Sequence, residues 1–225
     1  PYTTLFRSPH SRVTQNITTR GVSKTFIVTP NVLSYARSVF NCSTIPGIEL
    51  EDNINYKHTS IDKRFENHWD KRIMFNDYMV STFVNNPIFS IITFGLLLDT
   101  GWYTANPKGR YIPQMPHFGR GAGCSFFNSK CISSSGQPTY EGWSTDTRTD
   151  LCDFMSVAIG KGNLRTEQIE KFANGEFTVT IPTAYQYFAG EPTKGGSDYF
   201  TDFCPYIEPY IIYNLYDGTT FNPNS

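Results

Sequence analysis

The sequence has no long hydrophobic run and no strong excess of either charge. Its most hydrophobic stretch, Ile88–Leu98, would span about 16 Å as a helix, whereas a transmembrane helix needs about 20 apolar residues. The formal net charge is −1, and 17% of the residues are charged. We therefore predict no membrane span in this chain and no nucleic-acid-binding surface.

Cysteine is scarce, and none of the five cysteines forms a Cys-x-x-Cys pair. That spacing disfavours a zinc knuckle or a thioredoxin-like site, and the odd number leaves one thiol unpaired or bonded outside the chain. Asn-x-Ser/Thr sequons begin at Asn16 and Asn41. Together these features favour a secreted or cell-surface protein, in which disulfides persist and Asn16 and Asn41 carry glycans. A cytosolic protein with free thiols is the alternative.

A starting methionine and a signal peptide are missing too, because the sequence begins Pro1-Tyr2-Thr3. We expect a processed or partial chain. Its 225 residues suffice for one large domain or one and a half. Aromatic residues make up 16% of them and supply ample apolar surface for a core.

Two helices are predicted from cap signals and spacing. Thr29 and Pro30 fit the N-cap and first position of a helix, which apolar residues at helical spacing extend nearly to Cys42. A short strand, Thr25–Val28, precedes it. Asn86-Pro87 opens the second helix by the same logic, and Ile88–Leu98 makes it apolar almost all round, as expected of a buried core helix.

The texture of the sequence changes after Cys131. The run Ser133–Pro138 resembles a linker, so we place a domain boundary near residue 130, with regions 1–129 and 130–225. Beyond it we predict an amphipathic helix around Glu167–Ala173 and a strand at Phe177–Ile181. The expected fold class is α+β with long irregular loops.

Several charged and glycine-rich stretches invite a functional interpretation but do not require one. Glu49, Glu51 and Asp52 do not match the spacing of an EF-hand, so a solvated loop edge is the favoured interpretation. The run Asp70-Lys71-Arg72 is expected to form surface ion pairs. Gly119–Gly123 lacks the ending of a phosphate loop, and no clear helix follows it; a tight turn leading to Cys124 is favoured.

Five motifs follow one another in a fixed order along the chain. They are Gly47-Ile48-Glu49-Leu50-Glu51, His68-Trp69-Asp70-Lys71-Arg72, Asp77-Tyr78-Met79, Leu98-Asp99-Thr100-Gly101-Trp102-Tyr103 and Gly119-Arg120-Gly121-Ala122-Gly123-Cys124. In combination they resemble the leishmanolysin family of surface zinc metalloproteases, within the metzincin clan. The resemblance is good from Val28 to Cys131, returns weakly at Tyr199–Pro205, and is poor between Ile132 and Asp198.

The resemblance implies roles for four residues. Most metzincins carry their three zinc ligands in one motif, His-Glu-x-x-His-x-x-Gly-x-x-His, but leishmanolysin-like members have a long insertion before the third histidine. That third ligand would be His68, and Met79 would lie in the turn beneath the metal. Val80 and Ser81 would form part of the substrate-pocket wall. His117 is expected to be structural and not a ligand, and His10 and His58 are expected to be exposed.

The 225 residues contain no His-Glu-x-x-His. The first two histidines and the general-base glutamate are therefore expected upstream of Pro1, in a missing N-terminal half. We expect this chain alone to be inactive and to bind zinc poorly, because one imidazole does not satisfy a tetrahedral ion.

The complete protein is then expected to be a zinc-dependent metalloendopeptidase that cleaves protein or peptide substrates through a metal-activated water. This chain would be the C-terminal half of a metzincin-type catalytic region plus part of a disulfide-linked, mixed C-terminal domain. The alternatives are a catalytically inactive leishmanolysin-like adhesion or binding protein, and a glycosylated extracellular interaction domain that never bound metal. An intact upstream motif and the zinc content of the protein would distinguish them.

The resemblance also implies two disulfides, Cys42 with Cys124 and Cys131 with Cys204. Cys152 is left over. Membrane association is compatible with the resemblance, although this chain contains no predicted span.

Overall fold

The structure is a computed structural model that describes residues 13–51 and 67–210, apart from positions 83, 85, 107, 110, 111, 157, 173 and 174. The helices are α1 (Pro30–Phe40), α2 (Lys71–Met74), α3 (Ile91–Asp99), α4 (Cys124–Asn128) and the 3-10 helices η3 (Thr183–Tyr185) and η4 (Tyr199–Thr201). The strands are β1 (Thr14–Thr19), β2 (Val22–Ile27), β3 (Ile48–Glu49), β4 (Leu151–Cys152), β5 (Ile159–Gly162), β6 (Leu164–Arg165), β7 (Gln168–Phe172), β8 (Gly175–Val179), β9 (Gly195–Gly196) and β10 (Ile207–Pro209). The predictions for His10, His58 and Asp52 lie outside the described residues.

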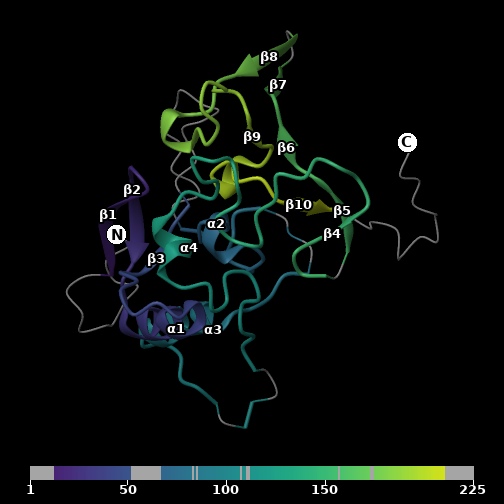
Figure 1. The fold of residues 1–225 in the computed structure, drawn as a ribbon. Coiled ribbons are helices and arrows are strands. Elements are labelled where there is room, and N and C mark those ends of the chain that lie inside the picture. The colour runs from purple at the N-terminus through teal and green to yellow at the C-terminus, as the bar shows by residue number, and fades with distance from the viewer. Residues whose placement is uncertain are drawn as a thin grey trace.

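The strands form small antiparallel sheets joined by long irregular segments (Figure 1). Two sheets have three strands each, in the orders β1-β2-β3 and β10-β5-β4, and β6 with β9 and β7 with β8 form pairs. Every pairing between these named strands is antiparallel. The expected α+β class is confirmed.

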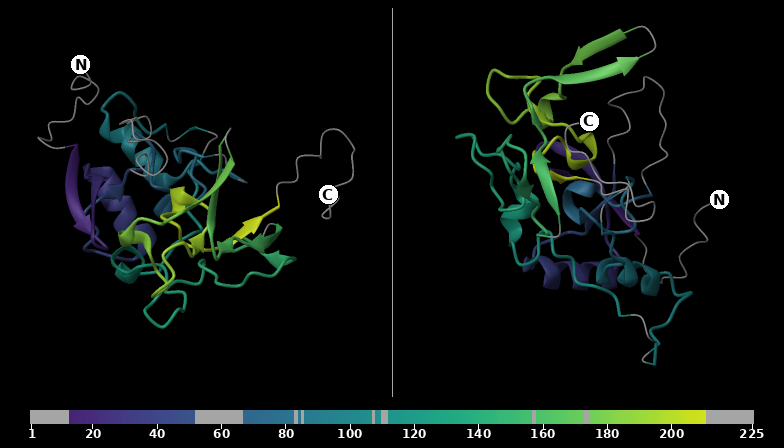
Figure 2. Two further views of the ribbon diagram at one scale, coloured as in Figure 1. Left: turned by 90° about the horizontal axis from the view of Figure 1, so that it is seen from above. Right: turned by 90° about the vertical axis from the view of Figure 1, so that its right-hand side faces the viewer.

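Helices α1 and α3 lie side by side beneath the sheets (Figures 1 and 2). Gly95 permits this approach, because a Cβ atom there would lie 2.7 Å from the Tyr35 ring. The Asp99 carboxylate at the end of α3 accepts hydrogen bonds from the backbone N–H groups of Asn31 and Val32. A carboxylate at a helix N-terminus satisfies N–H groups that have no partner inside the helix, so α3 caps α1.

Helix α1 begins as predicted. Thr29 is its N-cap residue and Pro30 its first residue, and it ends at Asn41, whose φ of 53° is left-handed. The Thr29 side chain makes no capping hydrogen bond. Asp99, which the sequence did not suggest for this role, takes that function instead.

The predicted start of the second helix is wrong. Its N-cap is Ser90, whose side chain accepts from the Thr93 N–H, and the helix begins at Ile91. The preceding residues are held in a different pairing: Ile88 donates its N–H to Asn76 O and accepts from Tyr78 N–H. These bonds keep the chain extended beyond Pro87.

Helix α3 is not buried all round. Ile92, Thr93 and Gly95 are buried, whereas the run Leu96–Leu98 is half-buried. Among the described residues, no helix combines the length and apolar character needed to cross a membrane.

The predicted helix around Glu167–Ala173 is also wrong. This segment forms β7, which pairs with β8 from Gln168 opposite Val179 to Phe172 opposite Gly175. The hairpin projects away from the rest of the molecule (Figure 2). Gln168 is buried while Ile169 is exposed, an alternation typical of a strand, and backbone pairing overrides the local helical pattern.

One hydrophobic core runs through most of the molecule. It combines residues of α1, α3 and α4 with Trp143, Cys204 and Tyr206. A second, smaller cluster contains Ile181, Tyr185 and Phe203. The main core thus includes residues from both sides of position 130, where the sequence predicts a domain boundary.

Candidate active site

His68 is half-buried and lies directly before the buried Trp69. Its backbone carbonyl accepts a hydrogen bond from the Glu51 N–H at 3.0 Å. Two residues on, the Asp70 N–H donates to Glu49 O, also at 3.0 Å. The segment that carries His68 is therefore held on both sides by the chain that continues from β3.

Trp69 joins the His68 segment to the turn that contains Met79. Its backbone N–H donates to Met79 O at 2.8 Å, and it forms bridges with Leu50 on one side and Val80 on the other. His68 and Met79 are eleven positions apart in the sequence, yet they lie on adjacent, hydrogen-bonded segments.

A buried carboxylate organises the Met79 turn. Asp77 Oδ1 accepts from the Met79 N–H at 2.7 Å, and Oδ2 accepts from the Ser90 N–H at 3.3 Å. The Thr93 hydroxyl lies 2.8 and 2.9 Å from the two carboxylate oxygens. Burial raises the pKa of Asp77 above its ordinary value, while the hydrogen bonds from Ser90, Met79 and Thr93 act in the opposite direction.

The same Thr93 hydroxyl accepts from Trp69 Nε1 at 2.8 Å. A hydroxyl can donate once and accept as well, so Thr93 links Trp69 to Asp77 in one chain of hydrogen bonds. Helix α3 therefore supports both the His68 segment and the Met79 turn. The side chain of Met79 is half-buried and packs against the main core.

The residues after the turn are placed beside this network. Val80 is buried in the main core, and Ser81 is half-buried. Their expected place in a substrate-pocket wall stays a prediction, as does the lack of a ligand role for His117, an exposed residue whose ring lies near Phe154.

The prediction of surface ion pairs at Asp70-Lys71-Arg72 is wrong. All three residues are buried. Asp70 caps α2 by accepting from the Arg72 N–H, and Lys71 pairs with Asp198 at 2.7 Å. The Arg72 guanidinium donates to the carbonyls of Phe126 and Ser129. Burial, with the nearby charge of Arg20, lowers the pKa of Arg72.

The prediction that Glu49 and Glu51 lie at a solvated loop edge is also wrong, since both are fully buried. Arg20 contacts both carboxylate oxygens of Glu49, at 2.8 and 2.6 Å. Burial opposes the charge of Arg20, but Glu49 and Asp202 outweigh it and hold the pKa of Arg20 above its ordinary value. Charged residues can be buried when each finds a partner.

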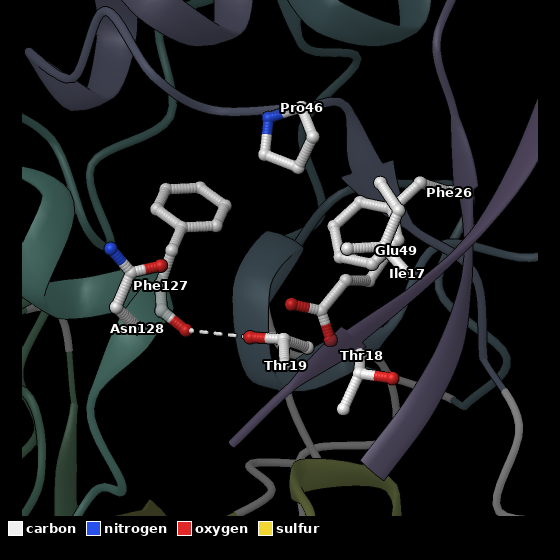
Figure 3. Close-up of a pocket in the computed structure, with 8 residues that line it drawn as sticks. All are labelled: Ile17, Thr18, Thr19, Phe26, Pro46, Glu49, Phe127 and Asn128. Carbon is white, nitrogen blue, oxygen red and sulfur yellow. Dashed lines mark hydrogen bonds between the residues drawn. The ribbon is translucent and has the colours of Figure 1, made fainter. Parts of the chain in front are cut away.

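A cavity of about 70 Å³ lies between β1 and α4 (Figure 3). Its lining residues are Ile17, Thr18, Thr19, Phe26, Pro46, Glu49, Phe127 and Asn128. Glu49 is its one charged lining group, and Arg20 already neutralises it. The cavity is too small for a peptide, so we assign it no part in the site.

Both disulfides implied by the resemblance occur in the structure. Cys42 bonds to Cys124, with Cα atoms 4.9 Å apart, and Cys131 bonds to Cys204, with Cα atoms 5.8 Å apart. Gly119, Gly121 and Gly123 have positive φ values, as the expected turn before Cys124 requires. A short helix, α4, nevertheless follows this turn, contrary to the prediction. Cys152 is a free, exposed thiol.

The imidazole of His68 fits one ligand position of a zinc centre, because a neutral histidine nitrogen is a preferred zinc donor. Among the residues that the structure describes, no group of three or more His, Cys, Asp or Glu side chains could hold a metal ion. The described residues do not form a closed zinc site by themselves.

Sequence reasoning missed the supporting residues of the site. Asp77 lies two positions before Met79, a spacing typical of an aspartate that accepts from the backbone of a turn. That signal could have identified it. Thr93 carries no comparable local signal, since its partners Trp69 and Asp77 are distant in the sequence.

The chain is similar to known peptidases over most of its length. A family model described as leishmanolysin matches residues 4–222. The leishmanolysin-like peptidase of Drosophila melanogaster is 30% identical over 206 residues, which cover 82% of this chain and 27% of that protein. The counterpart from Drosophila pseudoobscura pseudoobscura is 31% identical over 202 residues, with the same coverage.

Leishmanolysin of Leishmania chagasi is 23% identical over 177 residues, 78% of this chain and 26% of that protein. The chain thus spans about a quarter of the length of the curated relatives it matches. The family model covers nearly the whole sequence, and the chain belongs to the leishmanolysin family of metalloproteases.

Proposed function

We propose that this chain is part of a zinc metalloendopeptidase and contributes His68 as one ligand of the metal. The observation that carries the proposal is the hydrogen bond from the Trp69 N–H to Met79 O at 2.8 Å. It sets the segment bearing the proposed ligand directly against the Met79 turn, which we propose lies beneath the metal.

The contribution of this chain's own residues is to hold His68 in place. The Glu51 N–H donates to the His68 carbonyl, and the Trp69 N–H donates to the Met79 carbonyl. Thr93 hydrogen-bonds to both Trp69 and Asp77 and so stabilises the turn. A bound zinc ion would supply a water of lowered pKa as the nucleophile for peptide hydrolysis. A rigid ligand segment favours such a site, because metal affinity depends on the groups that orient the ligands.

The 225 residues contain no His-Glu-x-x-His, the motif that would carry the other two histidines and the general-base glutamate. The proposal assigns them to a part of the protein beyond this sequence, together with protein or peptide substrates. Val80 and Ser81 remain the proposed contribution of this chain to the substrate-pocket wall.

The test uses the complete protein. His68→Ala should lose stoichiometric zinc, measured by elemental analysis, and should lose cleavage of a denatured protein substrate. His117→Ala is the matched control and should retain both. A His68→Ala protein that keeps full zinc and activity contradicts the proposal. If the wild-type protein binds no zinc and cleaves no substrate, the alternative of a catalytically inactive adhesion or binding protein is favoured.

The location that we propose is extracellular, either secreted or at the cell surface. Two disulfides support it, and so does the exposure of Asn16 and Asn41, the two sequon asparagines. Asn16 lies in strand β1 and Asn41 at the end of α1.

Asn16→Gln and Asn41→Gln should each reduce the mass of the natural protein by one glycan. Unchanged masses for both variants would remove the glycosylation proposal.

A further inference from the structure

A buried cluster of charges lies behind the His68 segment. Lys24 Nζ is 2.9 Å from Asp70 Oδ2 and 3.0 Å from Asp202 Oδ1, and these side chains are at most 1% exposed. Asp70 and Asp202 are far apart in sequence, and Lys24 bridges them. A buried lysine is tolerated only where its partners are held in place, so this geometry fixes Asp70 relative to Asp202.

Asp70 transmits this constraint to His68, two residues before it. The backbone N–H of Asp70 donates to Glu49 O, and its side chain accepts from the Arg72 N–H at the start of α2. Displacement of Asp70 would break both bonds and release the segment between His68 and α2.

The backbone at Asp202, whose side chain contacts Lys24, has an uncommon conformation. Asp202 and Phe203 have φ values of 55° and 58°, and left-handed conformations are unfavourable for residues that have a Cβ atom. The Tyr187 hydroxyl donates to Asp202 O at 2.8 Å, and Cys204 is bonded to Cys131. The Tyr187 hydrogen bond and the Cys131–Cys204 disulfide thus hold Asp202 and Phe203 in this strained conformation, in which the Asp202 carboxylate contacts Lys24.

A second ion pair joins the same two parts of the chain. Lys71, the first residue of α2, lies 2.7 Å from Asp198 Oδ2, and Asp198 also caps η4 by accepting from the Phe200 N–H. The Tyr206 hydroxyl lies 3.1 Å from the same carboxylate. Helix α2 packs against η4 near the middle of the molecule (Figure 1).

We propose that the segment Asp198–Asp202 positions the metal ligand His68. Asp202 acts through Lys24 and Asp70, and Asp198 acts through Lys71, so both are positioning residues. This inference rests on the proposed function of His68. It assigns a role in the metal site to a region that lies some 130 residues after His68 in the sequence.

The test measures zinc release from the complete protein to a chromophoric chelator at a temperature well below the unfolding midpoint. Asp198→Asn and Asp202→Asn should each accelerate release, by up to the roughly 10- to 100-fold that loss of a group bonded directly to a ligand costs in metal affinity. Asp198 is partly exposed, so its variant tests the proposal even if Asp202→Asn does not fold. The Co²⁺-substituted variants should show an altered ligand-field absorption spectrum.

Two controls separate positioning from general loss of stability. Val39→Ala removes buried volume from α1; it should lower the unfolding temperature without accelerating release or changing the Co²⁺ spectrum. The double variant Lys71→Asp with Asp198→Lys restores the ion pair in reverse and should return the release rate towards that of the wild type.

The outcomes distinguish this inference from the proposed function. Release rates and spectra of Asp198→Asn and Asp202→Asn that match those of the wild type or of Val39→Ala overturn the positioning role, while loss of zinc in His68→Ala would still support the ligand. Retention of zinc in His68→Ala overturns both.

Discussion

At the scale of single residues, the Thr93 hydroxyl links the two segments of the proposed site. It accepts from the Trp69 indole and donates to Asp77, and all three residues are buried. Water cannot replace a lost partner at such a position without a rearrangement of the core. The stability of the Met79 turn therefore depends on side chains that are not themselves ligands.

Substitution of Thr93 by valine keeps the shape of the side chain but removes its hydroxyl. Trp69 Nε1 then lacks an acceptor, and we expect the free energy of unfolding to fall by about 1–3 kcal/mol. Urea denaturation of the complete protein measures the change. The exposed Thr149 provides the control, since Thr149→Val should change stability by less than about 0.5 kcal/mol. Equal effects of the two substitutions would show that the hydrogen bonds of Thr93 contribute little.

The raised pKa of Asp77 makes a prediction about pH. Because burial raises the pKa of Asp77 in the folded protein, the folded state holds this proton more tightly than the unfolded state. The stability that this group contributes is fully present below its ordinary pKa and is lost as the pH rises through the raised value. Asp77→Asn does not titrate at this position.

The unfolding free energy of the wild type minus that of Asp77→Asn should therefore fall as the pH rises from the ordinary aspartate range, and then become constant. Urea denaturation of both proteins across this range gives the difference. A difference that increases with pH would show that the donors from Met79, Ser90 and Thr93 outweigh burial.

At the scale of elements, the structure moves the start of α3 from Asn86-Pro87 to Ser90. Ser90→Ala should then reduce the free energy of unfolding by about 1 kcal/mol, the usual value of an N-cap. Asn86 does not cap the helix, and its φ of 50° disfavours alanine, so Asn86→Gly is the control and should not incur this loss. Thermal unfolding of both variants tests the boundary, and a Ser90→Ala protein as stable as the wild type would contradict a start at Ser90.

Some elements were predictable because their signals are local. The pair Thr29-Pro30 marks the start of α1 correctly, and the family resemblance implied the two disulfide pairs that the structure contains. The roles of His68 and Met79 in a metal site stay predictions. The burial of Glu49, Asp70 and Arg72 was not predictable in this way, because their partners come from other parts of the chain. Strand β7 depends likewise on β8, whose backbone pairing decides against the helix suggested by the residues alone.

At the scale of the whole molecule, two disulfides cross-link distant segments of one core. The Cys42–Cys124 bond has a sequence separation of 82. Replacement of both cysteines by serine should lower the free energy of unfolding by on the order of 4 kcal/mol if loop-closure entropy dominates. Cys152→Ser, at the exposed free thiol, should have almost no effect. Denaturation curves of both variants measure these changes in unfolding free energy, and an unchanged midpoint for the double variant would contradict the prediction.

The most direct test of the account is the position of zinc in the complete protein. We predict that anomalous scattering at the zinc edge, from crystals of the complete wild-type protein, places one ion about 2.0–2.1 Å from an imidazole nitrogen of His68, the usual distance for a histidine ligand. The Met79 turn should lie beneath that ion. Zinc bound at other residues, with the His68 ring outside the coordination shell, would contradict the account.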